Sequence, residues 1–238
     1  MHDTGEPAPD GGRIPRALAA AGIIGPILFT TAFIAQGLFR RGEYNATTED
    51  ISSLEAGPGL QGAVQQVNFA LFGLLLIAFA VGLHRGVRRS RAALTGPMIL
   101  ACNGVGLIIA GIFPLRQDAA GVTYDPLGVH SVNGRIFFLT IGLGLIVISR
   151  GLAADPRWRG LAAYVLATGI ALLVMFVPFG VLTQPSDAVL HPWLGLVQRA
   201  ILAIWLLCVI VLALRLRTVA IQTEVPPPTT RDRADRPS

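Results

Sequence analysis

Residues 63–83 read AVQQVNFALFGLLLIAFAVGL, a run without a charged side chain in which the polar residues come first. An α-helix rises 1.5 Å per residue, so roughly 20 residues cross the ~30 Å apolar core of a bilayer. The run does not alternate polar and apolar residues, as the strand of a membrane barrel would. It therefore predicts a membrane-spanning helix whose polar residues gather near one end.

Five further runs have this length and character. Of the 238 residues, 53% are hydrophobic and 14% are charged, whereas soluble domains carry about 25% charged residues. This composition excludes an intrinsically disordered chain and disfavours a soluble protein that binds nucleic acid. We expect an all-α polytopic membrane protein whose six-helix domain (17–215) lies between a disordered cytoplasmic arm (1–16) and a disordered cytoplasmic tail (216–238). The expected spans are 17–39, 63–83, 92–113, 129–148, 161–182 and 193–214.

The basic residues predict the orientation of the bundle. All 19 are arginine, and most precede the first span, follow the last, or lie in the loops after the second and fourth spans. The loops on the opposite side hold only Arg40, Arg41 and Arg116. Because arginine-rich loops stay in the cytoplasm, both termini are expected to be cytoplasmic.

Polar residues inside the spans cluster toward the extracytoplasmic side. They open the second, fourth and sixth spans, while the cytoplasmic halves of these spans are aliphatic and aromatic. Because polar groups are costly in lipid, this asymmetry predicts a polar recess that opens outward and is sealed below. With Asn103 near mid-membrane and Ser52 in the first outer loop, the candidate ligand-binding residues are Ser52, Gln65, Asn68, Asn103, Asn133, Arg135, Gln198 and Arg199.

Two of these candidates are cations inside predicted spans. Arg135 and Arg199 need partners, because an unpaired charge within the membrane costs several kcal/mol. The acids nearest by topology are Asp50, Glu55 and Asp118, all in outer loops. We expect ion pairs at the recess, or bidentate binding of a phosphate or carboxylate ligand by the two arginines.

Several stretches resemble one known family. They are Glu49-Asp50-Ile51-Ser52-Ser53-Leu54, Gly111-Ile112-Phe113-Pro114, His130, Gly195-Leu196-Val197-Gln198-Arg199 and the pair Gly25-Pro26. In this order, the pattern resembles the bacterial six-helix membrane proteins called domain of unknown function 998. The resemblance covers roughly residues 17–215 and implies a multi-pass protein of the bacterial cell (inner or plasma) membrane. The family name supplies no reaction.

Binding of a lipid or a small amphipathic ligand in the recess is the leading functional hypothesis. The alternative is an intramembrane enzyme acting on a lipid or isoprenoid headgroup. In it, His130 would be the acid or base, and Asp50 or Asp118 would orient it. A transporter, an assembly partner for another membrane protein and a homo-oligomer stay open.

The residues assigned to the possible enzyme site also allow structural interpretations. Asp50 with Ser52 and Ser53 fits a helix N-cap as well as part of a hydrolase triad, and no GxSxG motif is present. His130 can instead be a hydrogen-bonding residue that ties the fourth span to the first outer loop. No spacing of histidines or cysteines predicts a metal site or a cofactor.

Overall fold

The computed structural model describes residues 16–88, 90–183 and 189–224. Its long helices are α1 (Arg16–Phe39), α2 (Leu60–Gly86), α3 (Arg91–Ile112), α4 (Val129–Ala153), α5 (Arg159–Leu182) and α6 (Leu194–Glu224). All six are long and apolar enough to cross a membrane, which confirms the predicted all-α, six-span bundle. The short elements are the 3-10 helices η1 (Ile51–Ala56) and η2 (His191–Trp193) and the strands β1 (Arg116–Gln117) and β2 (Thr123–Tyr124).

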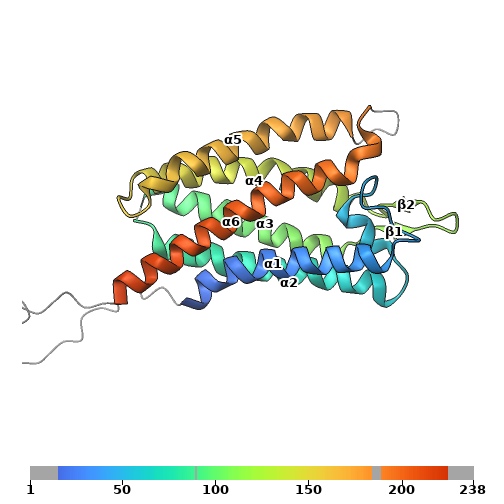
Figure 1. Ribbon diagram of the computed structural model, residues 1–238, viewed down its shortest axis with the longest axis horizontal. Coiled ribbons are helices and arrows are strands. Elements are labelled where there is room, and N and C mark those ends of the chain that lie inside the picture. Colours follow the sequence, from blue (N-terminus) through green and yellow to red (C-terminus); the bar gives the residue numbers. More distant parts are fainter. Residues whose placement is uncertain (1–15, 89, 184–188, 225–238) are drawn as a thin grey trace, which may run out of the picture.

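The bundle has two different ends (Figure 1). Helix η1 and the β1–β2 hairpin lie at one, here called the η1 end, while α1 begins and α6 ends at the other, the terminal end. This common location of the first and last helix ends agrees with an even number of spans. That the terminal end faces the cytoplasm stays a prediction from the arginine pattern.

One expected boundary is wrong. Residues 216–224 were expected in the disordered tail, but α6 continues through them to Glu224. The reason is packing, because Leu216, Val219 and Ala220 are almost completely buried. Leu216 also lies close to Gly82 of α2. The remaining parts of the predicted arm and tail (1–15 and 225–238) lie outside the described residues.

Consecutive helices pack side by side from α1 to α5, and α6 closes the bundle against α1 and α5. Two of these contacts depend on glycine pairs. A Cβ atom added to Gly73 would lie 2.4 Å from the carbonyl oxygen of Gly104, and one added to Gly104 would lie 2.7 Å from that of Gly73. Gly142 of α4 and Gly169 of α5 are related in the same way. Small residues thus let backbones approach, as is common between membrane helices.

The core of the bundle is aromatic on the side of the η1 end. Phe29 stacks on Phe72 with a centroid distance of 4.8 Å, and Trp205 meets the edges of Phe72 and Phe137 at 6.0 and 5.3 Å. These rings join α1, α2, α4 and α6. Many large apolar residues on the outer faces of the helices, such as Leu74, are exposed, as expected for side chains that meet lipid.

We expect Gly104→Ala to destabilise the bundle by about 1–3 kcal/mol, because the added methyl group must push α2 and α3 apart. The thermal midpoint of the purified protein in detergent measures this loss. The matched control is Gly160→Ala on α5, where an added Cβ has nothing within 4 Å. Equal midpoints for the two variants would contradict the close contact of α2 with α3.

Candidate functional site

The loop of residues 40–59, which contains η1, is held on the bundle by Arg199 of α6. Arg199 of α6 donates from Nη1 to the carbonyl oxygens of Ala46 (2.8 Å), Glu49 (3.0 Å) and Gly195 (2.8 Å), and from Nη2 to the hydroxyl of Tyr44. The expected ion pair of Arg199 with Asp50, Glu55 or Asp118 does not form, because its guanidinium group bonds to carbonyl and hydroxyl oxygens and no described acid lies in ion-pair contact with it. Arg199 clamps the loop to α6.

Further contacts strengthen this attachment. The backbone N–H of Gly195 donates to the carbonyl of Thr47 at 2.9 Å, and a Cβ at Gly195 would lie 2.3 Å from the carbonyl oxygen of Glu49. Arg40 donates from Nη1 to the carbonyl of Leu54 at 3.0 Å. The loop is thus bonded to the start of α6, while the Arg40 bond joins the two ends of the loop to each other.

Within the loop, Asp50 is the N-cap of η1. Its Oδ1 atom accepts hydrogen bonds from the backbone N–H (2.8 Å) and the hydroxyl (2.7 Å) of Ser53. The N-cap interpretation of Asp50 is confirmed. The side chain of Gln198 joins η1 to α6, because its Oε1 accepts from the N–H of Ile51 at 2.7 Å.

Two neighbouring cavities lie beneath η1. The aromatic cavity, of about 50 Å³, is lined by Phe29, Phe69, Phe72, Phe137 and Trp205 together with Asn133 and other residues. The polar cavity, of about 450 Å³, is lined by Asp50, Ser131 and Arg135 together with Phe176 and Phe179 of α5 and other residues. Both cavities share the walls formed by Ser52, His130, Gly134, Phe138 and Gln198.

The structure therefore brings only some of the predicted site residues together. Those that line at least one cavity are Asp50, Ser52, His130, Asn133, Arg135 and Gln198. Arg135 is exposed there, and no ion pair joins it to another described residue. Arg199 instead lines a groove between α1 and α6, so Arg135 and Arg199 do not face one shared site.

Three predicted residues join helices and do not line these cavities. The Oε1 atom of Gln65 accepts from the side-chain amide of Gln36 at 2.7 Å, and Asn68 donates to the carbonyl of Phe29 at 3.2 Å, so both tie α2 to α1. Asn103 accepts a 2.5 Å hydrogen bond from the hydroxyl of Thr140, which ties α3 to α4. These amides find protein partners because lipid offers none.

Asp118 also lies apart from the cavities. It is exposed in the β1–β2 turn, where its carboxylate accepts from the backbone N–H groups of Ala120 and Val122, both at 2.9 Å. The expected pairing of Asp118 with a buried arginine is wrong, since it stabilises its own turn. No group of three His, Cys, Asp or Glu residues within the described ranges is arranged to hold a metal ion.

Glu55 was expected only as an ion-pair partner of a buried arginine, and not as a residue of the site. The side chain of Glu55 is 0% exposed, and its Oε1 lies 3.7 Å from Nδ1 of His130. Neither carboxyl oxygen has a hydrogen-bond partner among the described residues. Burial, with the nearby charges of Asp50 and Asp125, raises the pKa of Glu55 to about 9, so the carboxyl group is protonated at neutral pH. The spacing of Ile51, Leu54 and Glu55 on one face of a helical turn could have revealed this burial.

His130 is positioned by the end of α3. Its Nδ1 atom lies 3.3 Å from the carbonyl oxygen of Phe113, which can only accept a hydrogen bond. In a neutral imidazole, Nδ1 then carries the proton and Nε2 holds a lone pair. The imidazole of His130 and the amide of Gln198 thus line the aromatic cavity, and the buried carboxyl group of Glu55 lies beside His130.

These features define a multi-pass integral membrane protein with two neighbouring cavities beneath η1, at one end of its bundle. The family model for protein of unknown function (DUF998) matches residues 23–215 of the chain. The chain belongs to this family, as its motifs indicated. Comparison with curated proteins and with solved structures gave no match.

We expect Glu55→Gln to change how stability depends on pH. The folded chain binds the Glu55 proton more tightly than the unfolded chain, whose glutamate has a pKa of 4.5. The Glu55 contribution is therefore complete below pH 4.5 and is lost as the pH rises toward 9. The neutral amide avoids this loss, so the variant should have a thermal midpoint several degrees above the wild type at about pH 8, and nearly the same midpoint at about pH 5.

Glu43→Gln is the matched control, because Glu43 lies in the same loop with its side chain 62% exposed. Its midpoint should differ from the wild type by a similar small amount at both pH values. Parallel pH profiles for Glu55→Gln and the wild type would contradict a protonated, buried Glu55.

Proposed function

We propose that this protein binds a lipid or a small amphipathic ligand in the two cavities beneath η1. The observation that carries the proposal is the division of chemistry between the cavities. Asp50, Ser131 and Arg135 line only the larger one, whose other walls include phenylalanine rings, whereas Phe29, Phe69, Phe72, Phe137 and Trp205 line only the smaller one. A ligand with a polar group and an apolar part matches both environments.

The volumes favour a modest ligand. A polar cavity of about 450 Å³ lies within the size range of small-molecule sites, whereas about 50 Å³ in the aromatic cavity admits only a small group. The ligand's polar part would lie against His130, Gln198 and Arg135. Its apolar part would contact Phe138, Phe176 and Phe179.

The proposed orientation places this site on the extracytoplasmic side of a bacterial cell membrane. It rests on the arginine pattern, because the arginine-rich terminal end then faces the cytoplasm. The polar cavity would accordingly take its ligand from the outer leaflet or from the solution outside. Arg199 serves this function indirectly, by keeping the loop of residues 40–59 over the cavities.

Filling the cavity from within its wall tests the proposal. Gly134 lines both cavities, and an added Cβ there has nothing within 4 Å, so Gly134→Leu occupies the space without a clash at its first atom. We expect native mass spectrometry of the gently purified wild type to show a bound small molecule. In Gly134→Leu the amount of this adduct should fall at least about tenfold, because the leucine side chain occupies the space in which the ligand would contact the cavity wall.

Ala163→Leu is the matched control, since Ala163 is exposed on the lipid-facing side of α5. It should keep the adduct of the wild type. The proposal fails if the wild type carries no bound molecule, or if Gly134→Leu and Ala163→Leu retain it equally.

The contact of Glu55 with His130 favours one second candidate, an intramembrane enzyme that acts on a lipid or isoprenoid headgroup. A buried carboxyl group 3.7 Å from an imidazole that lines a cavity is an arrangement used in acid–base catalysis. Asp50 and Asp118 would have no part in it, because both are engaged in their own turns. Glu55 would take the orienting role.

Under this candidate function, His130→Gln abolishes conversion of a membrane lipid extract by the purified protein, because glutamine cannot transfer a proton at neutral pH. Mass spectrometry of the lipids before and after incubation measures the conversion. The thermal midpoint should stay within a few degrees of the wild type. A wild-type protein that converts no lipid, or a variant that loses its fold, assigns His130 to binding or structure.

A further inference from the structure

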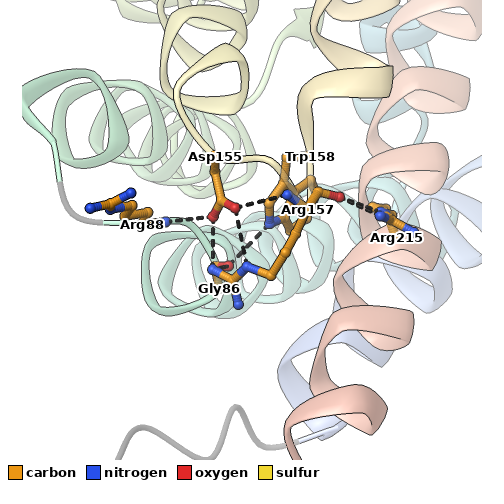
Figure 2. Close-up of polar contacts among 6 residues, drawn as sticks. All are labelled: Gly86, Arg88, Asp155, Arg157, Trp158 and Arg215. Atoms are coloured by element: carbon orange, nitrogen blue, oxygen red, sulfur yellow. Dashed lines mark hydrogen bonds and ion pairs between the residues drawn. The ribbon is translucent and has the colours of Figure 1, made fainter.

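The terminal end of the bundle is organised around one buried carboxylate. Asp155, in the turn between α4 and α5, accepts at Oδ2 from the backbone N–H of Arg88 (2.9 Å) and from Nη2 of Arg157 (2.7 Å). Its Oδ1 accepts from the N–H (3.0 Å) and Nε (3.1 Å) of Arg157 (Figure 2). The Arg157 side chain is the foremost cause that lowers the pKa of Asp155 to about 2, so the carboxylate stays charged.

This turn also binds the neighbouring helices. The carbonyl of Gly86, at the end of α2, accepts from the indole N–H of Trp158 at 3.1 Å and from Nη2 of Arg157 at 3.2 Å. From α6, Arg215 donates through Nε (3.0 Å) and Nη2 to the carbonyl of Arg157. Figure 2 shows Arg215 directed at the carbonyl oxygen of Arg157, whose own side chain turns toward Asp155 and Gly86.

The two arginines differ in how their charge is balanced. Arg157 has Asp155 as its counter-ion, whereas the bonds of Arg215 to the described residues go to a neutral carbonyl oxygen. No acidic side chain in the described ranges forms an ion pair with Arg215. Its Nη1 amino group also has no hydrogen-bond partner there, so two N–H donors are left for another acceptor.

A groove of about 510 Å³ adjoins these arginines between α5 and α6. One part is polar, with Arg157, Arg215 and Thr218, and the rest is apolar, with Trp158, Leu161, Val211 and Leu214. Gly160 lies in the same wall, and an added Cβ there would meet nothing within 4 Å. The groove therefore combines cationic donors with an apolar wall formed by two membrane-spanning helices.

We propose that this groove binds an anionic phospholipid, with its phosphate on Arg215 and the start of an acyl chain along the apolar wall. Charge complementarity selects this occupant, because a phosphate supplies the counter-ion that Arg215 lacks among the described residues. Basic pockets between membrane helices suit anionic headgroups, whose negative surface potential attracts arginine-rich ends of such helices. The site is independent of the cavities beneath η1.

Lipid exchange on the full-length protein tests this site. Purified protein in a neutral detergent is titrated with phosphatidylglycerol or with phosphatidylcholine of the same acyl chains, and bound lipid is counted by native mass spectrometry. We expect a saturable phosphatidylglycerol site in the wild type. Arg215→Gln should bind this lipid about tenfold more weakly, the loss expected when a charge-assisted hydrogen bond to phosphate is removed.

Arg217→Gln is the matched control, because it removes the same charge from an exposed residue of α6 that does not line the groove. It should leave phosphatidylglycerol affinity within about twofold of the wild type, since two residues turn an α-helix by about 200° and an exposed charge on the other side of α6 is largely screened. Gly160→Leu provides a second variant that leaves the charge unchanged. It should also weaken phosphatidylglycerol binding, because its side chain fills the groove. If Arg215→Gln lowers the thermal midpoint sharply, the result for Gly160→Leu tests the proposal in its place.

Three results would overturn the proposal. The first is an equal loss of phosphatidylglycerol affinity in Arg215→Gln and Arg217→Gln. The second is equal affinity of the wild type for phosphatidylglycerol and phosphatidylcholine, and the third is unchanged phosphatidylglycerol affinity in Gly160→Leu. sn-Glycerol 3-phosphate distinguishes a lipid from a free phosphate. If it competes with phosphatidylglycerol at equal concentration, the acyl chain contributes nothing and the site is one for a soluble anion.

Discussion

The apolar core of a membrane supplies no hydrogen bonds, so a polar side chain inside this bundle is stabilised where it bonds to another part of the chain. Asn68, Asn103 and Gln198 bond to groups on another element, and each thereby fixes the separation or rotation of two segments. Glycines let the bonded helices approach closely, such as Gly25 of α1 against Phe72 of α2 and Gly96 of α3 against Ile148 of α4. The cavities beneath η1 exist because this network positions a loop over the helix ends.

Buried ionisable groups have different surroundings at the two ends of the bundle. At the η1 end, Arg199 is surrounded by backbone carbonyls, and a protonated Glu55 lies beside His130. At the terminal end, Asp155 is an ionised carboxylate held by Arg157 and by backbone N–H groups. Burial without donors keeps one carboxyl group neutral, while several donors keep the other charged. The first arrangement suits a site that exchanges a proton, and the second suits a rigid connection.

Six of the site residues proposed from sequence do gather at the cavities, and His130 and Gln198 stand in the walls of both. Gln65 and Asn68 lie on the same helix face, as their spacing requires, but that face meets α1. Periodicity gives the relative directions of residues on one helix and leaves the rotation of that helix against its neighbours open. The bonds of Arg199 to Ala46 and Glu49 were not predicted for a related reason, since these partners lie about 150 positions away in the chain.

Local properties of the chain were sufficient to predict the number of spans, their approximate bounds and the family. They also predicted that the first helix begins and the last helix ends on the same side. Span length, hydropathy and arginine placement act on each segment separately, because every helix meets the membrane on its own. Tertiary contacts alone decided that Glu55 faces His130, that Arg199 clamps a loop and that α6 continues to Glu224. Those outcomes depend on helix rotation and loop path, which are set by packing between residues distant in sequence.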